Sequence, residues 1–166
     1  MLGTIFEQQT GKKIFEAFKE EIADPIGMQD FLLTDFRYQY EWNKSKHPAY
    51  HFRMTARDMA RFGLLYQNNG KYGDLQIIPP EWIAESTTPY SINNSSYYGY
   101  MWNIFPEELG FGNGFYHTGA GVHLLAVLPE TKLVLVHRVD TDKDFDITGN
   151  EFLQLMYMIA EARILD

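Results

Sequence analysis

The spacing of the apolar residues changes near residue 97, and this change limits the fold more than any other feature of the sequence. Before it, apolar residues recur every three or four positions along 14–22 and 59–66, which is typical of amphipathic helices. After it, they alternate with other residues or form short runs between turn residues, which is typical of strands. Four strands are predicted in this part, over residues 98–104, 115–118, 122–128 and 133–139.

Capping signals mark where two of the helices begin. Thr55 precedes Asp58 by three residues, just before the apolar residues of 59–66, and this spacing is typical of a capped helix start. Thr148 precedes Glu151 by the same spacing and predicts a further helix near the C-terminal end.

A length of 166 residues fits a single domain. We therefore predict an α+β fold, in which an antiparallel sheet is flanked by helices and the C-terminal helix packs on the sheet. Its parts are helices and an aromatic-rich loop over 1–96, antiparallel strands over 97–139 and a closing helix over 147–165.

The composition excludes several kinds of partner and site. There are 14 Lys and Arg against 22 Asp and Glu, which gives a net charge of −8. Such an acidic chain is not expected to bind nucleic acid or an anionic membrane, because both require concentrated positive charge. No apolar run is long enough to span a bilayer. The absence of Cys excludes a disulfide framework, a zinc–thiolate site and a cysteine nucleophile.

An aromatic-rich stretch over 29–54 contains Phe36, Tyr38, Tyr40 and Trp42 at every second position. This spacing predicts an extended segment with one aromatic face. The face could stack on sugars or peptides, but covering the core is the preferred interpretation.

Two sets of side chains are spaced as metal ligands could be: the alternating aspartates at 140, 142, 144 and 146, which lack the Gly and Glu pattern of a calcium loop and are interpreted as a charged surface loop, and a pair of histidines. His47 and His51 stand four residues apart, a spacing that would place both on one face of a helix. Pro48 argues against a helix there, and no third ligand is evident. We therefore predict neither a metal nor a cofactor, and a histidine metalloprotein is the least favoured hypothesis.

The tetrapeptide His117-Thr118-Gly119-Ala120 is the main candidate for chemistry. It lies between two predicted strands and follows a glycine-rich approach over 110–114. Alone, a strand that ends in Thr-Gly is more often structural than functional. Its place in an ordered set of motifs gives it more weight.

That set contains six segments, over residues 2–12, 24–28, 54–63, 79–83, 98–102 and 117–119. In this order they resemble the C-terminal half of the serine hydrolases related to class C β-lactamases and penicillin-binding DD-peptidases. Thr-Ala-Arg-Asp-Met-Ala-Arg-Phe-Gly, over 55–63, is similar to the S/T-A-R-D-L-A-R-F-G helix of that family. His117-Thr118-Gly119 occupies the place of its K-T-G triad, which many esterase and peptidase relatives write as H-x-G.

The resemblance implies a β-lactamase/transpeptidase-like fold and acyl transfer to serine, followed by hydrolysis of an ester, amide, peptide or lactam. It implies that His117 points at the nucleophile and substrate, and that Thr118 binds the substrate carboxylate or carbonyl. Gly119 would let the substrate approach the strand, and the backbone N–H of Ala120 would be an oxyanion-hole donor. A free imidazole titrates at about pH 6.5, whereas the lysine of K-T-G stays positively charged at neutral pH. The replacement of lysine by histidine therefore removes a permanent positive charge, which favours an ester or peptide substrate over penicillin.

The nucleophile motif of that family, S-x-x-K, is absent from these residues, because none of the five serines has a lysine three positions later. Tyr66-Gln67-Asn68 spells the family's Y-x-N motif, but it falls at the end of the helix that starts near Thr55, and we interpret Tyr66 as a core residue. We expect the nucleophile, its lysine and its tyrosine to lie upstream of Met1, so that this chain alone does not acylate.

Two interpretations follow for the chain as a whole. The first is part of a serine hydrolase that acts on a small-molecule or peptide substrate; the alternative is a non-catalytic module that binds peptides or peptidoglycan. Self-association is expected through surface that the other half of such a fold would cover. The resemblance favours a periplasmic or cell-envelope location, although residues 1–10 contain no signal peptide.

Overall fold

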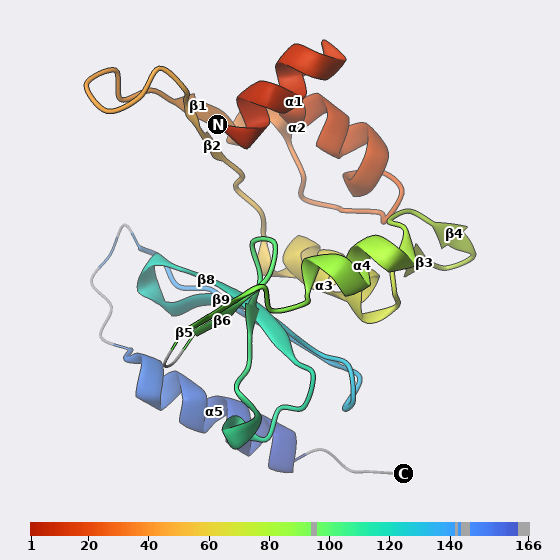
Figure 1. Ribbon diagram of the computed structural model, residues 1–166, viewed down its shortest axis with the longest axis vertical. Coiled ribbons are helices and arrows are strands. Elements are labelled where there is room, and N and C mark those ends of the chain that lie inside the picture. Colours follow the sequence, from red (N-terminus) through yellow and green to blue (C-terminus); the bar gives the residue numbers. More distant parts are fainter. Residues whose placement is uncertain (94–95, 142, 144–146, 163–166) are drawn as a thin grey trace. The chain divides into compact units, whose positions relative to one another are not determined.

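The helix-rich and strand-rich parts of the sequence form two units, Met1–Ser86 (unit 1) and Thr87–Asp166 (unit 2), in the computed structural model of the chain (Figure 1). The structure describes residues 1–93, 96–141, 143 and 147–162. The prediction that residues 1–166 make a single domain stays a prediction, and each unit is described by itself.

Unit 1 is mainly helical, with two short hairpins. Its helices are α1 (Leu2–Thr10), α2 (Ile14–Phe18), the π-helical turn η1 (Lys19–Ala23), the 3-10 turn η2 (Leu33–Asp35), α3 (Ala56–Gln67) and α4 (Pro80–Ser86). Its antiparallel hairpins are β1 (Arg37–Gln39) with β2 (Ala49–His51), and β3 (Lys71–Tyr72) with β4 (Leu75–Gln76). Helix α1 ends at Gly11, whose φ of 71° is the left-handed conformation that glycine adopts without strain.

Aromatic side chains form the core of unit 1. Phe15 of α2 stacks on Phe36 with ring centroids 5.3 Å apart, and Tyr38 packs against Phe15 at 5.0 Å. For these two residues of the aromatic segment, the predicted role of covering the core is confirmed. It is wrong for Tyr40 and Trp42, which are 45% and 72% exposed and stack on each other instead. The reason is that the chain stays in a strand only over β1, so the alternation of faces ends at Gln39.

Helix α3 begins as predicted, with the Thr55 side chain accepting a hydrogen bond from the backbone N–H of Asp58. The Asp58 side chain has a role that the sequence did not indicate. It is fully buried, and its two oxygens accept hydrogen bonds from the backbone N–H groups of Gln29 and Asp30, at 2.9 and 3.0 Å. Asp58 therefore fixes the loop after η1 to the first turn of α3.

The neighbouring Asp30 carboxylate strengthens the same junction. It accepts hydrogen bonds from the Arg57 guanidinium at 2.6 and 3.0 Å and from the Thr55 hydroxyl at 2.8 Å. The hydrogen bonds from Arg57, and then the one from Thr55, hold the pKa of Asp30 below its ordinary value.

Unit 2 is built on one six-stranded antiparallel sheet, with strand order β10-β9-β8-β7-β6-β5. The strands are β5 (Ser91–Asn93), β6 (Ser96–Tyr98), β7 (Asn103–Ile104), β8 (Phe115–Gly119), β9 (His123–Leu128) and β10 (Leu133–His137). The other elements are the 3-10 turns η3 (Glu107–Leu109) and η4 (Ala120–Val122), and the helix α5 (Gly149–Glu161).

The single strand predicted over 98–104 is wrong. The chain reverses within this segment, so that Tyr98 of β6 pairs with Asn103 of β7 in an antiparallel hairpin. The backbone N–H of Gly99 donates to the carbonyl of Trp102 at 2.8 Å, and Met101 takes a positive φ of 67°. The aromatic alternation continues through a turn here, which the spacing alone does not reveal.

Helix α5 packs on one face of this sheet, as predicted (Figure 1). Seven buried residues make up the core between them: Phe105, Phe111, Leu124, Ala126, Leu128, Phe152 and Met156. Thr148 and Glu151 form the predicted capping box at the start of the helix. The last part of the predicted closing helix, 163–165, lies outside the described residues. The α+β fold and the antiparallel sheet with its closing helix are confirmed.

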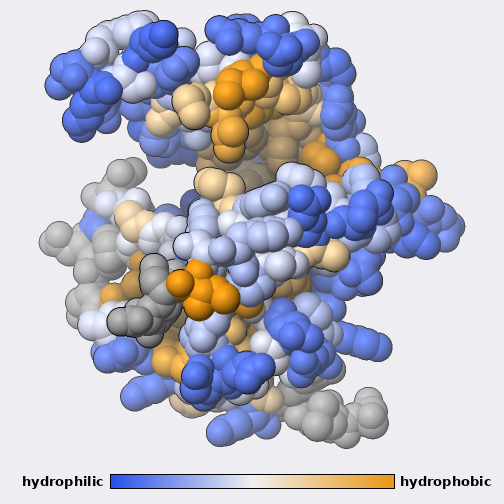
Figure 2. All heavy atoms as spheres, in the orientation of Figure 1, coloured by the Kyte–Doolittle hydropathy of each residue, from blue (hydrophilic) through white to orange (hydrophobic). Residues whose placement is uncertain are grey.

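Apolar side chains are also found on the surface (Figure 2). On α1 they include Leu2 and Ile5, which are 70% and 46% exposed. The structure does not test the predicted self-association, which stays a prediction. Within the described part of the chain, no helix has the length and the apolar character needed to cross a membrane.

Removing the buried carboxylate of Asp58 tests its role in unit 1. We expect Asp58→Ala to lower the free energy of unfolding by about 3 kcal/mol, because two backbone N–H groups lose the buried, charged acceptor that they share. Asp58→Asn should cost less, since one acceptor oxygen remains. Urea unfolding followed by circular dichroism measures both, with the exposed Asp74→Asn as the matched control. Equal midpoints for Asp58→Ala and the control would contradict this role.

The cap of α5 gives a second prediction for stability. Thr148→Ala should lower the free energy of unfolding by about 1 kcal/mol, whereas Thr148→Ser should keep most of the stability because serine caps as well.

Hydrogen bonds from the backbone and side chain of Thr148 lower the pKa of Glu151. Glu151 therefore adds stability above its ordinary pKa of 4.5 and loses that contribution as the pH falls through the lowered value. Urea midpoints at several pH values measure both effects; a Thr148→Ala midpoint equal to that of wild type would argue against the cap.

Candidate functional site

Strand β8 carries the predicted site at its C-terminal end. It lies between β7 and β9, and its pairing with β9 continues through His117, Thr118 and Gly119, which lie opposite Leu125, Leu124 and His123. All three residues and the following Ala120 are exposed, whereas Phe115 at the start of the strand is buried. The predicted site residues therefore stand together at an accessible end of a well-anchored strand.

The alternation of the strand separates the side chains of His117 and Thr118. Leu124, opposite Thr118, belongs to the core under α5, so Thr118 lies on the face that α5 covers. His117 lies on the other face, with Phe115 two residues earlier. On that face the ring of Phe115 packs edge-on against Trp102, with centroids 5.0 Å apart. The imidazole is therefore carried by the face of the sheet opposite α5.

Gly119 occupies a position that does not require glycine. Its φ of −144° and ψ of −179° are ordinary extended values. A Cβ atom added there would have one neighbour within 4 Å, the Cβ of His123 at 3.6 Å, which is an ordinary contact. By contrast, a Cβ on Gly114 would come within 2.9 Å of atoms of Phe105, Phe111 and Leu128. The missing side chain at 119 thus leaves open space beside the strand.

The turn that follows the site, Ala120–Val122, is held by two histidines, one at the start of β9 and one at the end of β10. His137 Nδ1 lies 2.8 Å from the carbonyl oxygen of Val122, and His123 Nε2 lies 2.8 Å from that of Val139. A carbonyl oxygen can only accept, so each ring nitrogen donates. The connection of both histidines to this turn is a feature that the sequence did not indicate.

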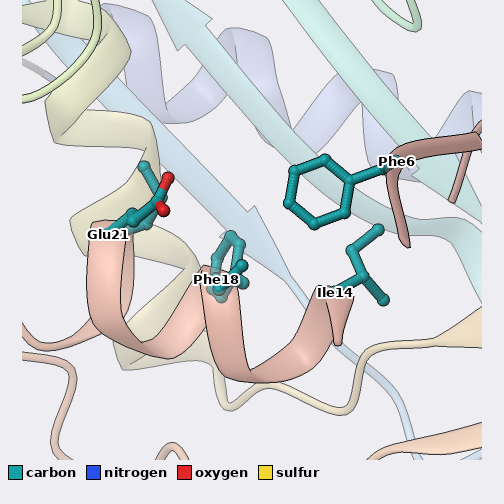
Figure 3. Close-up of a pocket in the computed structure, with 6 residues that line it drawn as sticks. Phe6, Ile14, Phe18 and Glu21 are labelled. Atoms are coloured by element: carbon teal, nitrogen blue, oxygen red, sulfur yellow. The ribbon is translucent and has the colours of Figure 1, made fainter. Parts of the chain in front are cut away.

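A pocket in unit 1 is lined mainly by apolar residues (Figure 3). It has a volume of about 260 Å³ and is lined by Phe6, Ile14, Ala17, Phe18, Glu21 and Ile22. Its one charged group, the Glu21 carboxylate, accepts a hydrogen bond from Lys12 at 2.9 Å. Apart from this carboxylate, the residues that line the pocket are apolar.

The structure also places Tyr66 and the two histidines that were considered as metal ligands. Tyr66 is buried in α3 with 8% of its surface exposed, so its interpretation as a core residue is confirmed. His51 lies on β2 rather than on a helix, so the helical spacing proposed for a pair with His47 does not form. Among the residues that the structure describes, no three His, Asp or Glu side chains come together to hold a metal ion.

Three solved structures share this fold. A structure described as "Putative 6-aminohexanoate-dimer hydrolase from Bacillus anthracis" is 26% identical, with a TM-score of 0.72 over 96% of this chain and 42% of that chain. A structure described as "putative beta-lactamase from Bacteroides dorei DSM 17855" is 16% identical, with a TM-score of 0.62 over 95% of this chain and 54% of that one. One described as "A class C beta-lactamase" is 15% identical, with a TM-score of 0.59 over 99% and 55%.

This chain thus spans between 42% and 55% of the length of these structures. No curated protein matches it significantly. The model of the family described as Beta-lactamase matches residues 1–153, which is most of the chain and includes both the helix at 55–63 and the H-T-G strand. The resemblance deduced from the order of six segments is confirmed: the chain belongs to the Beta-lactamase family.

Proposed function

We propose that this chain forms part of a serine hydrolase of the Beta-lactamase family and supplies the H-T-G wall of its active site. The observation that carries the proposal is the exposed end of β8, where His117 is accessible and Gly119 leaves open space that the fold does not need. A substrate could approach the backbone of the strand at this point, as an oxyanion hole requires.

The proposed reaction is acyl transfer from an ester or amide to a serine hydroxyl, followed by hydrolysis of the acyl-enzyme. The serine oxygen attacks the carbonyl carbon, the alcohol or amine leaves with a proton, and water then releases the acid. The backbone N–H of Ala120 would stabilise the negative oxygen of each tetrahedral intermediate, as a donor about 2.7–3.1 Å away. His117 would contact the substrate from the face opposite α5, and Thr118 would reach it only at the exposed end of the strand.

The nucleophile is proposed to come from outside these 166 residues. None of the five serines has a lysine three positions later, and the similar structures are about twice as long. The structure described as a 6-aminohexanoate-dimer hydrolase favours an amide or ester substrate, as does the replacement of the K-T-G lysine by His117.

The absence of S-x-x-K also supports a second candidate, a non-catalytic module that binds peptides or peptidoglycan. The reading frame upstream of Met1 in the native gene distinguishes the two. A frame that encodes S-x-x-K and then Y-x-N supports the hydrolase; a native protein that lacks both motifs supports the module.

Replacing His117 tests the proposed site in the native protein. We expect His117→Ala to lower kcat/KM for p-nitrophenyl butyrate by about 100-fold, because a group beside the reacting atoms is removed. The exposed His51→Ala serves as the matched control and should keep the wild-type rate. A His117→Ala enzyme that hydrolyses the ester as fast as the control would exclude His117 from the site.

A substitution of Gly119 distinguishes a loss of activity from a loss of stability. Gly119→Ala should change the free energy of unfolding by less than about 0.5 kcal/mol, because the added methyl group makes only an ordinary contact with the Cβ of His123. It should nevertheless lower kcat/KM by about 10-fold or more, since the methyl group would occupy the space through which the substrate approaches.

Gly114→Ala is the comparison for this variant, because its methyl group would clash and should destabilise unit 2. Urea unfolding and ester hydrolysis are measured on both variants. Full activity of Gly119→Ala would show that substrate does not approach the strand there.

A further inference from the structure

The turn after the H-T-G strand adopts a backbone conformation that its own sequence disfavours. Gly121 has φ of 73°, which glycine tolerates, but Val122 follows with φ of 55°. A β-branched residue in the left-handed region is strained, because its Cβ is crowded against its own backbone. Such a conformation persists only where the surrounding structure imposes it.

His137 provides that constraint from β10, two strands away from β8. Its Nδ1–H donates to the carbonyl oxygen of the strained Val122 at 2.8 Å. The imidazole is held in place by Phe152 of α5, with ring centroids 4.6 Å apart. His137 pairs with Leu124 at the end of the β9–β10 ladder, so its side chain lies beside the start of β9.

A second contact fixes the residue that follows the turn. His123 Nε2–H donates to the carbonyl oxygen of Val139, just beyond β10. The Val122 side chain packs against the core under α5. The C-terminal side of the turn is thus fixed to β10 and α5, whereas its first residue, Ala120, is exposed.

We propose that His137 is a positioning residue that holds the Ala120–Val122 turn in the conformation that aims the backbone N–H of Ala120 at the substrate oxygen. This inference rests on the proposed function. His137 does not touch the substrate: it acts on the Val122 carbonyl, two residues after Ala120. Without this hydrogen bond, Val122 relaxes from its left-handed conformation, and the peptide groups from Val122 back to the Gly119–Ala120 peptide, which carries the Ala120 N–H, rotate with it.

Three variants of the native protein separate positioning from general stability. His137→Leu removes the donor, and we expect kcat for p-nitrophenyl butyrate to fall by about 10-fold or more while KM changes by less than about 2-fold, because an oxyanion donor acts mainly on the transition state. His137→Asn places an amide N–H near the same point and should recover most of kcat. Met156→Ala, in the same core but with the donor intact, is the matched control: it should unfold more easily yet keep kcat at a temperature where it is folded.

A rate unchanged in His137→Leu, or an equal loss in Met156→Ala, would overturn the positioning role. A His137→Asn variant no better than His137→Leu would overturn it as well.

Nuclear magnetic resonance tests the hydrogen bond without depending on catalysis. At pH 8, long-range ¹H–¹⁵N spectra of the native protein should show the ring proton of His137 on Nδ1 and that of His123 on Nε2. His137→Leu should raise the amide exchange rates of Ala120 and Gly121 by about 10-fold or more. A proton on Nε2 of neutral His137, or unchanged exchange, would overturn the inference. An inactive wild-type protein with these signatures would instead overturn the proposed function and leave the hydrogen bond in place.

Discussion

The pairing of β9 with both of its neighbours is the constraint on which the rest of unit 2 depends. From Leu124 to Leu128 every residue of this strand is at most 4% exposed, and it pairs with β8 on one side and β10 on the other. One face of the strand packs under α5, so the register of β9 decides which residues of β8 meet that core. A slip of one residue would turn His117 towards α5 and Thr118 away from it. The position of the candidate site is thus set by a strand that contributes no chemistry.

Where a structural feature depended on adjacent residues, the sequence was a good guide. The starts of α3 and α5 were predicted because a threonine and an acidic residue three positions later determine the cap locally. The prediction was wrong for the β6–β7 hairpin, since Tyr98 and Trp102 keep the alternation of a strand while the chain reverses between them. Asp58 shows a different limit: its spacing predicted a local cap, but its carboxylate binds backbone groups at Gln29 and Asp30, almost 30 residues away. No local pattern contains that contact.

The same distinction between local features and long-range contacts applies to the candidate site. The order of the motifs identified the family and the H-T-G strand, and the spacing of apolar residues predicted both this strand and the strand that follows it. The turn after the strand could not be predicted, because valine at residue 122 argues against a left-handed conformation. That conformation depends on His137, which is 15 residues further along the chain. Nothing near His137 in the sequence indicates which backbone group it would bind.

Two residues within four positions, at the end of β8 and in the turn after it, depart from the type that their backbone conformation favours. Gly119 is a glycine where the backbone is extended and a side chain would fit, and Val122 is a β-branched residue where glycine would be unstrained. Each departure costs stability, because glycine loses more chain entropy on folding and valine is strained at positive φ. Departures of this kind are expected at functional sites. The oxyanion hole proposed for this strand end would need open space at 119 and a fixed turn at 120–122, because a substrate carbonyl would have to lie beside the backbone.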